Sequence, residues 1–225
     1  MIELASAAYS YGGDDILTDL NLRLAPGSFH FLTGPSGSGK TTLLRLCYME
    51  LLPTLGTVRV FGRDVTEIGR DEVAQNRRRI GIVHQDCKFL DHLSLAENIA
   101  LPLEVSGRDV RNEAENMSEL LAWVGLAERR GNYPPQLSGG ERQRAALARA
   151  VIMSPDVIIA DEPTGNIDWD MALRLLHLLV ELNRMGKTIL IATHDLNLIR
   201  AAKAQVPARV LRIQNRRLQL AGADL

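Results

Sequence analysis

The sequence predicts an α/β domain whose parallel sheet is covered by helices on both faces. One observation is that short apolar runs rich in β-branched residues, at residues 157–160 and Thr188–Ala192, have the length of buried strands. Another is that an amphipathic helix, residues 173–180, lies between these two runs and is closed by Gly186. Strands that alternate with helices give parallel sheets, because a parallel pair needs a crossover connection. The 225 residues, 46% of them hydrophobic, suffice for one domain with a sizeable core.

The first part of the chain predicts strands around one glycine-rich loop. Leucines alternate with polar residues at positions 20–24, which indicates a half-buried strand. Pro26 and Gly27 turn the chain into a second strand, residues 28–33, which ends at the loop. A helix is expected to follow from residue 40 to residue 52, where Pro53 stops it. Two more short strands are expected, at residues 57–61 and 80–84.

The middle of the chain is expected to be mostly helical. Ser94 and Glu97 resemble a capping box, which opens a helix that ends near Pro102. Two further helices are expected from spacing and composition, at residues 110–124 and 141–154. The sequence therefore indicates one domain, residues 1–225, with a helical insertion at approximately residues 87–153.

The bulk composition argues against several classes of function. Twenty-six Lys and Arg against 27 Asp and Glu give a formal net charge of -1, which argues against nucleic-acid binding through bulk charge. The two cysteines form no CxxC pair, so neither a disulfide framework nor a thiolate zinc site is expected. No apolar stretch approaches the roughly 20 residues that cross a bilayer. If the protein works at a membrane, we expect another chain to supply the span.

A phosphate-binding pattern lies at the glycine-rich loop. It fits G-x-x-x-x-G-K-[ST], after a strand and at the start of a helix, with Gly34, Pro35, Ser36, Gly37, Ser38, Gly39, Lys40 and Thr41. Glycines let backbone N–H groups converge on phosphate oxygens, and the helix dipole adds positive potential there. Lys40 can reach the outer phosphates, Thr41 can ligate Mg²⁺ through its hydroxyl, and Thr42 belongs to the same binding set. The pattern predicts a nucleotide site; a purely structural glycine turn is the alternative.

Two carboxylates follow the apolar run at residues 157–160. Ligands of parallel α/β sheets bind beyond the carboxyl ends of the strands, where Asp161 and Glu162 are expected. Asp161 is placed to hold the water shell of Mg²⁺, and Glu162 to polarise an attacking water. A strand followed by an acidic turn without function is the alternative. Beside the phosphate loop, the two carboxylates predict nucleotide hydrolysis.

A second anion-binding surface precedes the Ala-rich helix. Residues 137–144 read Leu-Ser-Gly-Gly-Glu-Arg-Gln-Arg and place a hydroxyl and two glycines at a helix N-terminus. This stretch resembles the signature of the ATP-binding-cassette (ABC) ATPases. The resemblance implies a P-loop NTPase core of the RecA type, an N-terminal antiparallel β subdomain and an inserted α-helical signature subdomain. It also implies a head-to-tail homodimer, in which one subunit closes on ATP held by the other through Ser138, Gly139, Gly140 and Glu141.

The remaining motifs of the ABC family follow in family order. Tyr11 lies where an aromatic ring stacks on adenine, with Tyr9 as a second candidate. Gln85 matches the glutamine that touches Mg²⁺ and senses the membrane partner, and Asp168 ends the loop that crosses the dimer interface. His194 matches the histidine at the γ-phosphate. The resemblance thus assigns catalysis to Glu162, His194, Lys40 and Gln85, and Mg²⁺ binding to Thr41, Gln85 and Asp161.

Three stretches are similar to the bacterial cell-division ATP-binding proteins of the FtsE type, at residues 29–34, 161–166 and 192–199. The resemblance implies a peripheral ATPase at the cytoplasmic face of the bacterial inner membrane, with an FtsX-like integral membrane protein as partner. Contact with the membrane is expected through that partner, and no direct contact with nucleic acid is expected. ATP-driven dimerisation is then expected to regulate septal cell-wall hydrolysis in cell division.

Other members of the ABC family stay open as alternatives. Residues 161–166 are shared with ATPases of lipoprotein release and macrolide export, so the chain can instead serve such a transporter. The near-zero net charge disfavours a cassette that acts on nucleic acid or ribosomes. One departure from the relatives is Leu95-Ala96-Glu97, where an aromatic residue is common. The groove for the membrane partner is expected to differ there.

Overall fold

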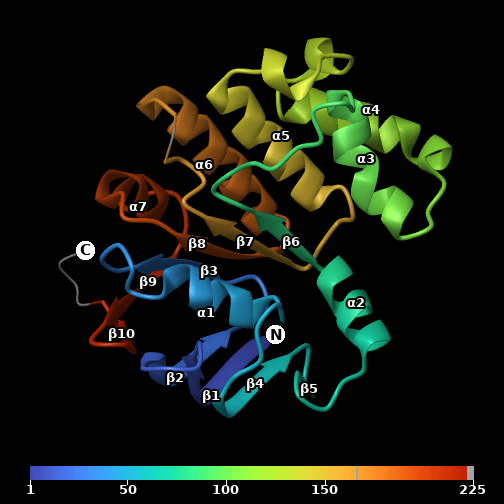
Figure 1. Cartoon of the computed structure of the whole chain (residues 1–225). Helices are drawn as coiled ribbons and strands as arrows, with labels where there is room; N and C mark the ends of the chain where they lie inside the picture. Colours follow the sequence, from blue (N-terminus) through green and yellow to red (C-terminus); the bar gives the residue numbers. More distant parts are fainter. Residues whose placement is uncertain (166, 222–225) are drawn as a thin grey trace.

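The computed structural model describes residues 1–165 and 167–221 (Figure 1). Its centre is a six-stranded sheet in the order β10–β9–β3–β8–β7–β6. The strands are β3 (Phe29–Thr33), β6 (Ile80–Val83), β7 (Val157–Asp161), β8 (Thr188–Ala192), β9 (Ala208–Gln214) and β10 (Arg217–Leu220). Neighbours pair in parallel except β9 and β10, which form an antiparallel hairpin. The predicted parallel sheet is confirmed.

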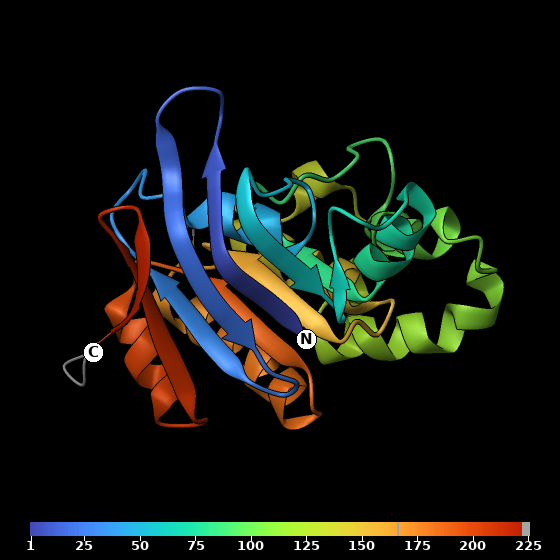
Figure 2. The same cartoon turned by 90° about the horizontal axis from the view of Figure 1, so that it is seen from below.

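A second, antiparallel sheet is built mainly from the first residues of the chain. Its order is β2–β1–β4–β5, with β1 (Ile2–Ser10), β2 (Asp15–Leu24), β4 (Leu55–Val60) and β5 (Arg63–Asp64). The predicted alternation on β2 is observed, since Leu20, Leu22 and Leu24 are buried while Asn21 and Arg23 are exposed. Seen from below in Figure 2, this sheet lies across the central one. It matches the expected N-terminal antiparallel β unit.

Each face of the central sheet packs on its own apolar core. Side chains alternate along a strand, so Ile189 and Ile191 of β8 join one core and Leu190 joins the other. Four helices outside the helical group described below are α1 (Lys40–Cys47), α2 (Arg70–Arg78), α6 (Trp169–Arg184) and α7 (Leu196–Lys203). Helix α1 packs between the two sheets, whereas α6 and α7 cover the opposite face of the central sheet (Figure 1). Both faces are therefore covered, as predicted.

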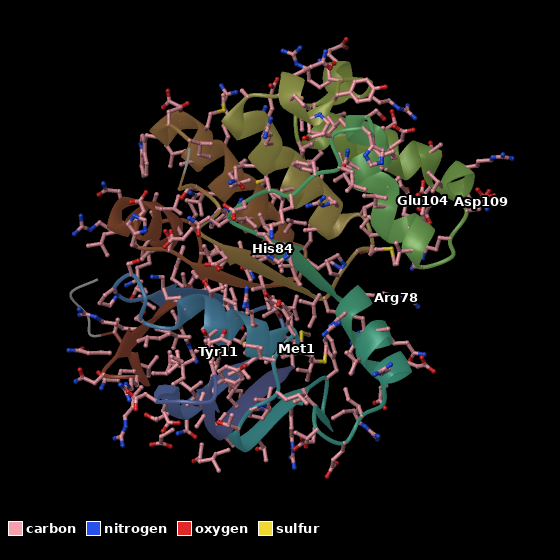
Figure 3. All side chains as sticks on the ribbon, in the orientation of Figure 1. Met1, Tyr11, Arg78, His84, Glu104 and Asp109 are labelled. Carbon is pink, nitrogen blue, oxygen red and sulfur yellow. The ribbon has the colours of Figure 1, made fainter. Side chains whose placement is uncertain are left out.

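Helices fill the chain between β6 and β7. They are α3 (Leu95–Val105), η1 (Val110–Glu113), α4 (Ala114–Trp123), η2 (Ala127–Arg129), η3 (Pro134–Gln136) and α5 (Gly139–Val151). In Figure 2 this group lies at the end of the molecule opposite to the β9–β10 hairpin. Glu104 and Asp109, labelled in Figure 3, lie on the outer side of the group. Every regular element in the predicted insertion, residues 87–153, is a helix.

Several predicted helix boundaries are wrong, among them the end of the 141–154 helix, since α5 ends at Val151. Helix α1 ends at Cys47 rather than residue 52, because Met49 adopts a left-handed backbone with φ of 62°. Helix α3 continues through Pro102 to Val105, since the buried side chains of its turns pack into the core and offset the one lost hydrogen bond. The first four residues of the predicted 110–124 helix form the 3₁₀ turn η1.

Several elements of the structure were not predicted from the sequence. Strands β1, β5, β9 and β10 and helix α7 were not expected from the chain alone. None of the helices in the described part of the chain combines the length and apolar character needed to cross a bilayer.

Candidate nucleotide-binding site

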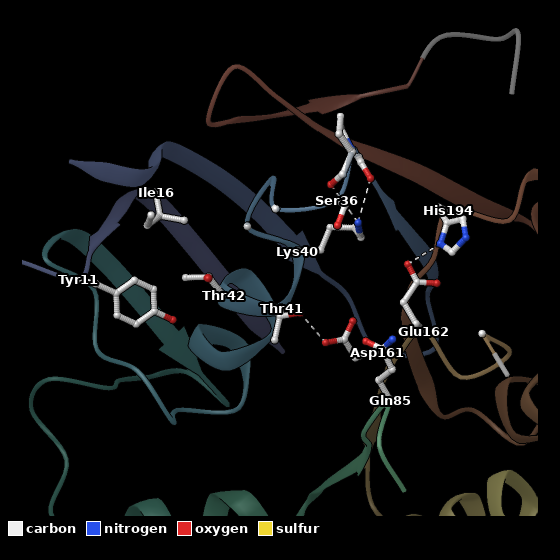
Figure 4. Close-up of a pocket in the computed structure, with 15 residues that line it drawn as sticks. Tyr11, Ile16, Ser36, Lys40, Thr41, Thr42, Gln85, Asp161, Glu162 and His194 are labelled. Atoms are coloured by element: carbon white, nitrogen blue, oxygen red, sulfur yellow. Dashed lines mark hydrogen bonds and ion pairs between the residues drawn. The ribbon is translucent and has the colours of Figure 1, made fainter. Parts of the chain in front are cut away.

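A pocket of about 660 Å³ lies at the carboxyl edge of the central sheet (Figure 4). The ends of β3, β6, β7 and β8 converge there, as expected for parallel α/β sheets. Its walls are Tyr11, Ile16, Gly34, Pro35, Ser36, Gly37, Gly39, Lys40, Thr41, Thr42, Gln85, Asp161, Glu162, Gly165 and His194. The fold thus brings together residues from distant parts of the chain that the sequence had assigned to one nucleotide site.

The glycine loop is held in a conformation that only glycine adopts easily. Gly34, Gly37 and Gly39 have φ values of 152°, 75° and 99°. A Cβ atom on Gly39 would lie 2.8 Å from Cδ2 of Leu17, and one on Gly34 would lie 2.7 Å from Oγ of Ser38. The loop therefore passes too close to its neighbours for side chains at these two positions.

Helix α1 begins directly at this loop and presents its backbone N–H groups to the pocket. Its N-cap is Gly39, and no side chain caps the first turn. The Nζ of Lys40 donates to the carbonyl oxygens of Gly34, at 2.9 Å, and Pro35, at 3.2 Å. An uncapped helix N-terminus with an adjacent ammonium group suits a bound phosphate, because both supply positive potential and N–H donors.

Thr41, Asp161 and Gln85 form the oxygen-rich side of the pocket. The Thr41 hydroxyl donates to Oδ2 of Asp161 at 2.7 Å, which joins α1 to the end of β7. Burial raises the pKa of the Asp161 carboxyl, the charge of neighbouring Glu162 adds to this rise, and the Thr41 hydrogen bond opposes it. Hydroxyl, carboxylate and amide oxygens are hard donors that suit Mg²⁺, so this set fits the expected metal.

Glu162 and His194 form a hydrogen-bonded pair in the wall of the pocket. Nδ1 of His194 lies 2.9 Å from Oε1 of Glu162, and only 11% of the Glu162 side chain is exposed. Glu162 has a left-handed backbone with φ of 45°, which is strained for a residue with a side chain. Its N–H donates to the carbonyl of Ala192 on β8, and its carbonyl accepts from Gly165. These bonds hold the carboxylate in place before any substrate binds.

Tyr11 rather than Tyr9 lines the pocket. Tyr11 is 57% exposed, and its ring meets the Tyr9 ring edge-on at a centroid distance of 4.8 Å. Tyr9 packs against the core under the antiparallel sheet. The free face of Tyr11 is available for an adenine ring, and its stacking role stays a prediction.

The signature residues lie outside this pocket. Ser138 caps α5 in a capping box, in which its Oγ accepts from Glu141 N–H at 3.2 Å and Glu141 accepts from Ser138 N–H at 2.8 Å. Asp168 caps α6 by accepting from the N–H of Met171 at 3.0 Å. Gly140 packs against Met171, where an added Cβ would lie 3.2 Å from Cγ. Within one chain, the structure does not bring Ser138, Gly139, Gly140, Glu141 or Asp168 to the phosphate loop.

Two pocket residues escaped the sequence reasoning. Ile16 lies on β2 beside the loop, and an isolated apolar strand residue carries no motif that would reveal it. Gly165 belongs to the stretch that the sequence identified as an interface loop, yet it also lines the pocket. Ser38 was expected to bind nucleotide but does not line the pocket, since its hydroxyl is buried against the loop.

Comparisons with known proteins agree with this geometry. The sequence profile of the ABC transporter family matches residues 17–165. The chain belongs to this family. It is an ABC ATPase, and the P-loop NTPase fold with helical insertion that the family resemblance implied is confirmed.

Individual ABC proteins are similar over most of the chain. Cell division ATP-binding protein FtsE of Haemophilus influenzae is 41% identical over 201 residues, which cover 88% of this chain and 92% of the relative. The FtsE protein of Escherichia coli K12 is 43% identical over 198 residues and 88% of each chain. A solved structure, the ATP-binding cassette MJ0796 in a dimeric post-hydrolysis state with ADP and Pi, has a TM-score of 0.85 and 32% identity. It covers 99% of this chain and 100% of its own.

Proposed function

We propose that this ABC ATPase is the motor subunit of an FtsE/FtsX-like complex, in which two copies close on two molecules of ATP. The observation that carries the proposal is the separation of the two groups of site residues. One chain supplies the phosphate loop, the carboxylates and His194 in a single pocket, while its signature serine faces elsewhere. A second copy in head-to-tail orientation would complete each pocket.

The pocket residues divide the work of hydrolysis among them. Backbone N–H groups of the loop and the Lys40 ammonium bind the phosphates of ATP. Thr41, Asp161 and Gln85 would hold Mg²⁺, which when bound neutralises charge on the phosphate oxygens. Glu162 accepts a proton from a water molecule, whose oxygen bonds to the γ-phosphorus as the bond to the bridging oxygen breaks. ADP and inorganic phosphate are released.

His194 has two tasks in this scheme. Its hydrogen bond to Glu162 at 2.9 Å orients the carboxylate, and its exposed ring, 75% accessible, can reach the γ-phosphate. Lys40 and His194 then both stabilise the negative charge that spreads over the transferring phosphoryl group. The backbone hydrogen bonds of Glu162 with Ala192 and Gly165 hold its strained backbone, and with it the base, in place.

The signature of the second copy is proposed to complete the site. Ser138 stands at the N-terminus of α5, and it and the adjacent Gly139 are exposed, whereas Gly140 is buried. Glu141 stays in the capping box, and Asp168 caps the neighbouring helix α6. The dimeric state of the MJ0796 cassette supports a pairing of this kind.

The relatives support a task in cell division. Those named above are cell division ATP-binding proteins, aligned along most of their length. We place the chain at the cytoplasmic face of the inner membrane, bound to an FtsX-like integral membrane protein that supplies all contact with the bilayer. ATP-driven closure of the dimer would move that partner and regulate septal cell-wall hydrolysis. No nucleic-acid contact is part of this proposal.

Depletion combined with co-purification tests this task. An affinity-tagged chain extracted in detergent should carry an FtsX-like membrane protein, and depletion should give filamentous cells that fail to separate. A Glu162→Gln copy should not restore division, whereas a wild-type copy should. Normal division together with a lipoprotein-release or macrolide-export defect would instead identify the transporter alternative.

A further inference from the structure

Arg149, in the last turn of α5, is a half-buried cation without an acidic partner among the described residues. Burial lowers the pKa of its guanidinium, because the charged form loses hydration. A favourable contact with the helix dipole would not require burial, since an exposed arginine in the last turn gains the same interaction. The side chain must therefore be held by specific contacts.

Those contacts are both made to the segment that follows Gln85. Nη1 of Arg149 donates to the carbonyl oxygen of Lys88 at 2.6 Å. Its guanidinium carbon lies 4.5 Å from the centre of the Phe89 ring, a cation–π distance. Phe89 is in turn packed against the main core. Figure 1 shows this segment crossing α5 on its way from β6 to α3.

The same helix carries Ser138 at its other end. Arg149 lies eleven residues after this N-cap, which corresponds to about 16 Å along a helix that rises 1.5 Å per residue. Gln85, three residues before Lys88, lines the pocket of the same chain, whereas Ser138 serves the pocket of the second copy under the proposed function. Helix α5 therefore connects the segment that follows Gln85, at the pocket of its own chain, to Ser138, at the pocket of the second copy.

We propose that Arg149 is a positioning residue that couples the two ATP sites by clamping residues 88–89 to the last turn of α5. When Gln85 is drawn toward the contents of its own pocket, the clamp makes α5 follow and moves Ser138 relative to the second pocket. This inference rests on the proposed function, because it needs two composite sites. It adds a residue that does not touch the nucleotide.

The test measures ATP-driven dimerisation in the Glu162→Gln background, which should retain ATP. Arg149→Gln should raise the protein concentration for half-maximal dimerisation about tenfold, within the usual range of coupling between sites. ATP binding by the dilute monomer should change less than about twofold, because Arg149 is not in the pocket. Phe89→Leu removes only the ring and should give a smaller shift of the same sign. If Arg149→Gln does not fold, the shift measured with Phe89→Leu tests the coupling role in its place.

Arg79→Gln is the matched control. Arg79 makes a similar pair of contacts elsewhere, to Asp156 at 2.7 Å and over the Phe61 ring at 3.7 Å. Its loss should lower the melting temperature without changing the dimerisation concentration. A purely structural role of Arg149 would give the same pattern as this control, which would overturn the proposal.

A second readout checks that the effect passes through Gln85. In a Gln85→Ala background, Arg149→Gln should add less than a twofold shift, because the two residues act in one path. A full tenfold shift in that background would overturn the coupling role. If the Glu162→Gln parent itself never dimerises with ATP, the proposed function fails, and this inference fails with it.

Discussion

Replacing Ser138 by Ala should separate a structural task from a catalytic one. In the folded chain the hydroxyl accepts from the Glu141 N–H at 3.2 Å, so its removal leaves one donor of α5 without a cap. Loss of such a cap costs about 1 kcal/mol. For a chain of this length that corresponds to a fall in melting temperature of about 2–4 °C. If Ser138 also donates to the γ-phosphate of the second copy, hydrolysis should fall about a hundredfold, as when one transition-state donor is lost.

The chain contains a matched control for this substitution. Ser94 caps α3 in the same capping-box geometry, with Glu97 N–H donating to its Oγ at 3.4 Å. Ser94→Ala should lower the melting temperature by a similar amount and leave steady-state hydrolysis at saturating Mg-ATP within about twofold of the parent. Thermal unfolding and phosphate release measured on both variants decide the matter. Equal hydrolysis by the two variants would refute the assignment of Ser138 to the second site.

Three further substitutions address the pocket itself. Lys40→Ala should weaken ATP binding at least about a hundredfold in a calorimetric titration, because the phosphates lose their cationic partner; near-parental affinity would contradict this. Gly39→Ala should lower the free energy of unfolding by more than about 1 kcal/mol in urea, since its φ is 99° and the new Cβ would meet Leu17 at 2.8 Å. Asp161→Asn should abolish hydrolysis yet unfold at a higher temperature than the parent at neutral pH. The raised pKa of Asp161 means that the native carboxylate is destabilising above that pKa and is relieved as acid protonates it, so the difference in melting temperature should shrink toward low pH. A difference independent of pH would argue against this origin.

Local signals made the centre of the fold predictable. The strand before the phosphate loop, the loop and the start of α1 depend on neighbours in sequence, and the structure has them as expected. The early end of α1 depends instead on the left-handed backbone at Met49, whose side chain is buried in the core and whose carbonyl accepts from Arg77 of α2. The β9–β10 hairpin was also missed, because its turn uses positive φ at Asn215 and Arg216, and Arg216 stands where such turns usually have Gly.

The candidate site also combines residues that the sequence predicts with residues whose place depends on the tertiary structure. Motif residues such as Asp161 and Glu162 follow a strand directly, so their place at the sheet edge could be predicted. Ile16 could not, because its presence in the pocket depends on how β2 lies over the glycine loop. The task proposed for Ser138 was available only through family resemblance, since no physical pattern in one chain would reveal a contact with a second copy.

The most direct test of the account is the mass of Glu162→Gln in solution with Mg-ATP. The account predicts that this variant binds ATP without hydrolysing it and forms a closed dimer of about twice the 24.8 kDa chain mass, with two ATP molecules per particle. With ADP in place of ATP it should return to 24.8 kDa. Sedimentation velocity with nucleotide quantification measures both. A variant that binds one ATP per chain and remains a monomer would contradict the claim that two copies build each active site.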